Sequence, residues 1–258
     1  MLGKLLKYEM DAVGRRLMPL FAAWAATSVL LGLGVGRLDT EGDLFAILSI
    51  LVYIVVTTAV FVMFLILIIQ RYRNSLLGDE AYFNLTLPVS ITEHLANKTL
   101  SALIWSVIST LAALVSVVLI LLFSSGLKEF LNLNITAFLK QLYAGVTWQA
   151  VLIFIEVIVV GLFSIVKSIL AIYAAITLGH QAKKRVTLAS IGAYIGLLVL
   201  ETTLGRVFMP LFNIELNEQS AFGTFQYVML VSLIATLCLS AFYFYICKYL
   251  LERKADLN

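Results

Sequence analysis

Charged side chains are scarce in this sequence: Asp, Glu, Lys and Arg make up 13% of its 258 residues, whereas hydrophobic residues make up 62%. Soluble domains average about 25% charged residues and about 45–50% apolar residues. A chain of this composition has too few polar side chains to cover a water-exposed surface. The composition therefore argues against an ordinary soluble fold.

Cysteine is equally rare, and the motifs of catalytic and nucleotide sites are missing. Cys238 and Cys247 lie nine residues apart in one apolar run, without the spacing of a zinc site or a disulfide framework, so we interpret them as small apolar fillers. The pair Gly3-Lys4 lacks the glycine spacing of a phosphate-binding loop, and HExxH and GxSxG do not occur. We therefore expect no catalytic residue, metal site or cofactor in this chain, and no enzymatic activity of its own.

Long uncharged runs are what the sequence does contain. A helix needs roughly 20 mostly apolar residues to cross a bilayer, and four runs are free of Asp, Glu, Lys and Arg: Leu17 to Gly36, Leu44 to Ile69, Thr99 to Leu127, and Gln219 to Cys247. Two further apolar stretches lie between Gln141 and Gly205, and none of the runs alternates as the strands of a β-barrel do. The predicted fold class is an all-α membrane protein with six transmembrane helices, at about 17–36, 44–69, 99–123, 146–170, 186–205 and 225–247.

The basic residues predict the orientation of these spans. Cytoplasmic loops carry an excess of Lys and Arg. With a cytoplasmic N-terminus, thirteen of the 18 basic residues fall on the inner side, four on the outer side, and Lys167 falls within the fourth span. The net charge of +3 thus reflects membrane orientation, and nucleic acid is not an expected partner. We predict a multi-pass membrane protein with both termini, including the tail 248–258, in the cytoplasm.

Residues 1–16 form a predicted amphipathic helix on the inner membrane surface. Leu6, Met10 and Val13 share one helical stripe, whereas Lys7 and Arg15 lie on another. The competing interpretation is a cleaved signal peptide. The long, partly acidic start of the sequence and the apolar run that continues to residue 36 favour the interfacial helix.

The connection 70–97 is longer than closure between two helices requires. It holds two arginines, the glycine and acidic pair GDE, the apolar and aromatic run AYFNLTLP, and then Ser90-Ile91-Thr92-Glu93. The last four residues have the form of a capping box, in which serine and glutamate side chains satisfy free amides at a helix start. We therefore predict that the third helix begins in the cytoplasm, near Ser90. The apolar run is interpreted either as a solvated turn or as a docking element for a cytoplasmic partner.

The sequence resembles the membrane subunits of ABC exporters of the type-2 permease class, especially small six-span bacterial permeases. The resemblance rests on MLGKLLKYEM, on GDEAYFNLTLPVS and on IYAAITLGHQAKKR, and with the span spacing it covers essentially the whole chain. It implies that the loop after the second span is a coupling element for a separate ABC ATPase, which would bind the ATP and magnesium. By this resemblance the ATPase-contacting residues are Asp79, Glu80, Tyr82, Phe83 and Leu87. A second permease subunit, identical or different, and membrane lipid are the other expected partners.

Two charges interrupt the fourth span. Glu156 and Lys167 are eleven residues apart, about three turns, so they share a helical face without pairing directly. A charge in a span is costly and usually faces a bundle interior, a cavity or the interface. For Glu156 the alternatives are a contact with a translocation pathway or neighbouring helix and a structural hydrogen bond. For Lys167 we favour extension toward the inner interface over a substrate contact.

Small residues mark two further segments. Gly192 and Gly196 have the small-xxx-small spacing that permits close helix approach. Packing explains them, and the resemblance adds a subunit contact through the first and fifth spans. Gly32, Gly34 and Gly36 end an apolar span with no preceding strand, so we interpret them as helix-packing or helix-ending residues and not as a nucleotide fingerprint.

The functional hypothesis from the sequence is thus a permease subunit of an ATP-driven exporter, with a hydrophobic or amphipathic peptide, antibiotic or lipid as substrate. An ion-gradient-driven secondary transporter, with Glu156 as a proton site, is the first alternative, although we find no internal repeat to favour it. A membrane anchor or sensor subunit that does not transport is the second.

Overall fold

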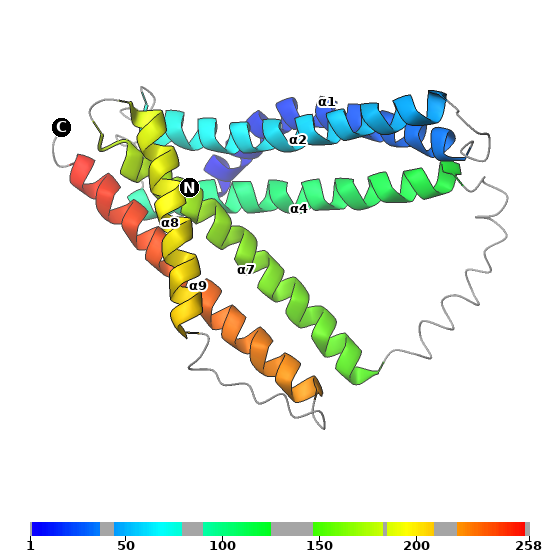
Figure 1. Cartoon of the computed structure of the whole chain (residues 1–258). Helices are drawn as coiled ribbons and strands as arrows, with labels where there is room; N and C mark the ends of the chain where they lie inside the picture. The colour runs from blue at the N-terminus through cyan, green and yellow to red at the C-terminus, as the bar shows by residue number, and fades with distance from the viewer. Residues whose placement is uncertain are drawn as a thin grey trace. The chain divides into compact units, whose positions relative to one another are not determined.

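The computed structural model describes residues 2–36, 44–78, 90–124, 147–182, 185–208 and 221–255. The regular structure in these ranges consists of six α-helices (Figure 1). They are α1 (Leu2–Val35), α2 (Leu44–Leu76), α4 (Ile91–Ser124), α7 (Trp148–Gly179), α8 (Val186–Phe208) and α9 (Ala221–Ala255). Each predicted span falls on one of these helices, so the predicted fold class is confirmed.

All six helices are long and apolar enough to cross a membrane. Large apolar side chains are exposed along them, as for Phe61 on α2, Leu114 on α4 and Phe154 on α7. Such exposure is unfavourable in water and natural in lipid, where it carries no hydrophobic penalty. The chain is therefore an all-α, multi-pass membrane protein.

The chain divides into two compact units, which are described separately. Unit 1 comprises Met1–Leu2, Ile69–Leu103 and Thr147–Asn258; unit 2 comprises Gly3–Ile68 and Ile104–Val146. Unit 1 therefore holds α7, α8 and α9 together with the end of α2 and the start of α4. Unit 2 holds nearly all of α1 with the remaining parts of α2 and α4.

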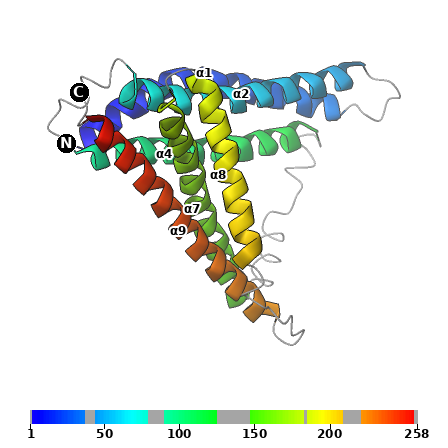
Figure 2. The ribbon, with the colours of Figure 1, turned by 60° about the vertical axis from the view of Figure 1, so that its left-hand side comes forward.

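Unit 2 is built from three helical segments that run side by side (Figures 1 and 2). Its buried centre is formed by Val13 and Leu17 of α1, Leu67 of α2 and Trp105 of α4. Two glycines allow α1 to approach its neighbours: a Cβ on Gly32 would lie 2.7 Å from Phe123 Cβ of α4, and one on Gly34 would lie 2.1 Å from Ser49 Oγ of α2. The prediction that these glycines pack helices is confirmed.

Unit 1 is organised around α7, which packs against both α8 and α9 (Figure 2). The C-terminal part of α7 is largely buried between Ile169 and Thr177, where aliphatic and small residues surround Tyr173. Close approach also occurs where α7 ends, because a Cβ on Gly179 would lie 2.4 Å from the backbone nitrogen of Ser190 on α8. The small residues of α7 and α8 therefore set the geometry of this helix pair.

The start of α4 has the capping geometry that the sequence predicts. The backbone nitrogen of Ser90 donates to Glu93 Oε2 at 3.1 Å, and the backbone nitrogen of Glu93 donates to Ser90 Oγ at 3.3 Å. These reciprocal bonds satisfy two of the free amides at the helix start. The prediction that the third helix starts at Ser90, before its apolar span, is confirmed.

The N-terminal segment is not a separate helix, because α1 continues from Leu2 through Pro19 to Val35. Lys7 and Arg15 are exposed, whereas Met10 and Val13 pack into the centre of unit 2. The apolar face thus contacts protein at these two positions. The position of residues 1–16 on the membrane surface stays a prediction.

Candidate functional site

A charged contact joins α7 to α8 inside unit 1. The ammonium of Lys167 on α7 donates to Glu201 Oε1 on α8 as an ion pair, with side chains 16% and 25% exposed. Tyr243 on α9 donates its hydroxyl to the other carboxylate oxygen, Glu201 Oε2, at 3.4 Å. We call Lys167, Glu201 and Tyr243 the ion-pair network. It connects three helices through one carboxylate.

The ion-pair network lies far from the helix ends at the turn between α7 and α8. Lys167 precedes Gly179 by twelve residues and Glu201 follows Val186 by fifteen, which places them about 18 Å and about 22 Å along their helices from that turn. Both residues lie within helices that are long and apolar enough to cross a hydrocarbon core of roughly 30 Å. A lone charge there is strongly disfavoured, so each of the two ions stabilises the other.

A second polar contact joins α7 to α9. Gln226 Nε2 on α9 donates to Glu156 Oε2 on α7 at 3.1 Å. The partner of the Glu156 carboxylate is thus a neutral amide. The partner of Glu201, in contrast, is the Lys167 cation. Glu156 thus contacts α9, and its role in a translocation pathway or as a structural hydrogen bond stays a prediction.

The placement of Lys167 differs from the sequence prediction. We expected its side chain to extend toward the inner interface, whereas its ammonium contacts Glu201 within the spans. The sequence interpretation considered Glu156 and Lys167 only along one helix and left Glu201 without a role. The sequence spacing could have predicted this pair. Lys167 and Glu201 are at similar distances along the chain from the turn after α7, so a helical hairpin brings the opposite charges close together.

A buried aromatic cluster lies where α2 ends and α4 begins. The rings of Tyr72 on α2 and Tyr173 on α7 stack with centroids 3.9 Å apart and planes 7° apart. The hydroxyls of Tyr72 and Thr177 are hydrogen-bonded at 2.7 Å, and the Tyr173 hydroxyl donates to the backbone oxygen of Lys98 on α4 at 3.5 Å. We call Tyr72, Tyr173 and Thr177 the aromatic cluster. All three are buried, and Cys247 of α9 is buried beside them.

The aromatic cluster lies beside the two helix ends that flank the loop between α2 and α4. The predicted ATPase-contacting residues Asp79, Glu80, Tyr82, Phe83 and Leu87 lie outside the described residues. Both helix ends that flank this loop are attached to α7, through Tyr72 on one side and the carbonyl of Lys98 on the other. Both flanks of the loop are therefore in direct contact with α7.

The glycines predicted to mediate close packing on α8 face open space. Gly192 and Gly196 are exposed, and a Cβ added to either would meet nothing within 4 Å. The described residues therefore do not show the close helix packing predicted at these two positions. A subunit contact through this face stays a prediction.

The fold and the charged contacts define a class: a six-span, all-helical membrane protein with paired charges inside its spans. Among the described residues, no three His, Cys, Asp or Glu side chains are grouped so that they could hold a metal ion. Neither a protein-family model, nor a curated protein, nor a solved structure matches the chain.

Proposed function

We propose that this chain is the membrane-spanning permease subunit of an ATP-driven exporter of the ABC type. It pairs with a second permease subunit, identical or different, and with separate ABC ATPases that bind ATP and magnesium. The substrate is a hydrophobic or amphipathic peptide, antibiotic or lipid. The chain lies in a bacterial cell membrane with both termini in the cytoplasm.

The observation that carries this proposal is the aromatic cluster. A subunit driven from outside the bilayer needs a rigid connection between its cytoplasmic contact and its spans. The stacked rings and the two hydrogen bonds supply one, because they attach both flanks of the loop 79–89 to the buried surface of α7. Packed interiors transmit displacement because they are close-packed.

The ion-pair network extends this connection across the spans. Helix α7 is tied to α8 through Lys167 and Glu201, and to α9 through Gln226 and Glu156. A movement of α7 therefore has polar contacts through which to move or separate two further helices. In the proposed cycle, ATP-driven closure of the ATPases pushes the loop and shifts α7 relative to α8 and α9.

The first experiment tests the partner. The tagged chain is expressed in cells that encode ABC ATPases and purified from the membrane, and the co-purifying proteins are identified by mass spectrometry. We expect an ATPase in the wild-type sample and its loss in the D79K/E80K double variant. D11K is the matched control, because Asp11 is exposed on α1 and lies far along the chain from the loop. An ATPase that remains bound to D79K/E80K, or none bound to the wild type, overturns the proposal.

The second experiment separates binding from coupling. Y72F removes the hydroxyl that contacts Thr177 but keeps the ring on which Tyr173 stacks. We expect the purified Y72F complex to retain its ATPase and to lose part of the ATP-dependent efflux of a hydrophobic fluorescent dye. Y249F is the control, since Tyr249 is an exposed tyrosine on α9. Equal efflux from Y72F and Y249F would remove the aromatic cluster from the mechanism.

An ion-gradient-driven transporter is the second candidate, and the observation that favours it is a carboxylate within the spans, Glu156, whose contact is a neutral amide. Dye efflux by the wild-type chain distinguishes the two. ATP-driven transport stops on ATP depletion, whereas gradient-driven transport continues until an uncoupler is added.

A further inference from the structure

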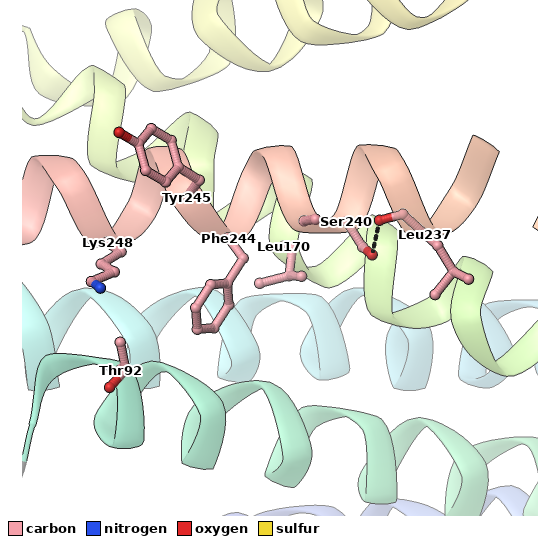
Figure 3. Close-up of a pocket in the computed structure, with 8 residues that line it drawn as sticks. Thr92, Leu170, Leu237, Ser240, Phe244, Tyr245 and Lys248 are labelled. Carbon is pink, nitrogen blue, oxygen red and sulfur yellow. Dashed lines mark hydrogen bonds between the residues drawn. The ribbon is translucent and has the colours of Figure 1, made fainter. Parts of the chain in front are cut away.

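A groove opens along α9 in unit 1, with a volume of about 680 Å³ (Figure 3). One residue of α4, Thr92, and one of α7, Leu170, line it together with six residues of α9: Leu237, Ser240, Ala241, Phe244, Tyr245 and Lys248. The groove shares no residue with the ion-pair network or the aromatic cluster. The residues that line it therefore differ from those that carry the proposed function.

The α9 residues that line the groove follow one helical face, with spacings of three and four residues between Leu237 and Lys248. Their character changes in order along the helix. The deep end holds Leu237 and the small side chains of Ser240 and Ala241, aromatic rings follow at Phe244 and Tyr245, and the cation of Lys248 comes last. The groove is thus amphipathic along its length.

The dimensions match one leaflet of a bilayer. Eleven residues of helix rise about 16 Å, close to half of a hydrocarbon core of roughly 30 Å. The Ser240 hydroxyl donates to the backbone oxygen of Leu237 at 2.8 Å within the same helix, so it leaves no free donor at the deep end. An acyl chain can therefore lie on this part of the groove without burying an unsatisfied polar group.

The other end offers a positive charge at the level expected for a headgroup. Lys248 lies across the groove from Thr92 (Figure 3), whose hydroxyl is hydrogen-bonded to the Ser90 hydroxyl at 2.9 Å. Glu252 Oε1 lies 3.8 Å from Lys248 Nζ, but both side chains are more than a third exposed, at 39% and 49%. An exposed pair of this kind is weak, so the lysine keeps its capacity to bind an anion. The basic residues predict that this end of α9 is cytoplasmic, where anionic lipids are concentrated.

We propose that this groove binds an anionic phospholipid of the inner leaflet. The phosphate contacts the Lys248 ammonium, the interfacial part of the lipid contacts Tyr245 and Phe244, and one acyl chain follows Ala241 and Leu170 toward Leu237. A lipid matches both ends of the groove, whereas a free phosphate would use only one of them.

The test measures lipid retention by the full chain. The protein is purified in a mild detergent, incubated with equal amounts of phosphatidylglycerol and phosphatidylcholine, and examined by native mass spectrometry. We expect the wild type to retain phosphatidylglycerol preferentially, and K248Q to lose that preference by about fivefold, the effect of one basic residue near a membrane surface. R253Q is the matched control, because Arg253 is an exposed cation on α9 that does not line the groove. Equal preference in K248Q and the wild type, or an equal loss in R253Q, overturns the proposal.

A second pair of variants tests the apolar end. A241W fills the groove and should lower retention of both lipids, whereas A235W places the same ring at an exposed α9 position outside it. Helix content by circular dichroism and a single gel-filtration peak confirm that both variants are folded. Unchanged retention by folded A241W overturns the proposal. Displacement of phosphatidylglycerol by millimolar inorganic phosphate would also overturn it, because the site would then recognise phosphate and not a lipid.

Discussion

The two units use different chemistry to join their helices. In unit 2 three interhelical hydrogen bonds of the described residues join neutral groups: Trp24 Nε1 donates to Thr57 Oγ1 at 2.9 Å, and Ser116 Oγ lies 2.8 Å from both the Ser28 and the Tyr53 hydroxyls. We call Ser28, Tyr53 and Ser116 the hydroxyl network. In unit 1 the contacts include full charges, in the ion-pair network and at Glu156.

The difference between neutral and charged contacts helps to distinguish residues that pack helices from residues that are candidates for function. A serine or tyrosine in a span can bond within its own helix, as the Ser28 hydroxyl does with the backbone oxygen of Trp24, so its presence costs little. A lysine and a glutamate in a span are costly and depend on each other. Helices can be joined by hydroxyls alone, so charges are not required for packing. We therefore locate the functional candidates within the spans in unit 1.

The largest expected effect is that of E201Q, which removes the counter-charge of Lys167. We expect a loss of about 3 kcal/mol in the free energy of unfolding, the order of the cost of one uncompensated charge within a span. The double variant K167M/E201Q should regain most of that loss, because no charge is then left unpaired. Denaturant titrations of the purified proteins in micelles measure both. If E201Q costs no more than a hydroxyl deletion in unit 2, the contrast between the units fails.

The next comparison sets a packed glycine against an exposed one. G34A places a Cβ 2.1 Å from Ser49 Oγ and 3.3 Å from Ala46 Cα, and such overpacking costs about 1–3 kcal/mol. G192A meets nothing within 4 Å, so the free energy of unfolding should stay the same or rise slightly, because alanine is the better helix former. Micelle unfolding measures both variants.

The bulkier G192L addresses the subunit contact on the same face. If Gly192 lies in an interface, G192L should lower the yield of cysteine cross-linked dimers in membranes while the unfolding free energy of the monomer stays unchanged. Intact cross-linking in G192L would show that the exposed glycine face of α8 is not a subunit contact.

Hydropathy was sufficient for the fold, because the length and apolar character of a span are properties of consecutive residues. The capping box at Ser90 was predictable for the same reason. The Lys167–Glu201 pair was missed, since it depends on how two helices are aligned across a turn, and Tyr72 was missed because a tyrosine near a span end has no distinctive pattern. Gly32 and Gly192 have similar sequence surroundings, but only the structure shows that one is packed and the other exposed.

A smaller effect is expected within the hydroxyl network. S116A removes the group that Ser28 and Tyr53 share. Interhelical hydrogen bonds in membranes average about 0.6 kcal/mol each, so we expect S116A to lower the free energy of unfolding by about 1 kcal/mol. Dye efflux should not change, because this network is neutral and has a packing role. Lost efflux from a stable S116A protein would extend the functional region into unit 2.

The smallest effect on stability, and the most informative, belongs to Glu156. E156Q keeps the size of the side chain and an acceptor for Gln226, so the change in the free energy of unfolding should stay below about 0.6 kcal/mol, the value of one interhelical hydrogen bond. E156Q nevertheless removes the negative charge. Dye efflux should be unchanged if Glu156 makes only a structural hydrogen bond, and it should be lost if Glu156 belongs to a pathway or is a proton site. Loss of dye efflux from stable E156Q would therefore group Glu156 with the charges of the ion-pair network. Unchanged efflux from both E156Q and Q226L would show that this contact has a packing role, like the neutral hydrogen bonds of unit 2. Lys167 and Glu201 would then be the charges that distinguish unit 1.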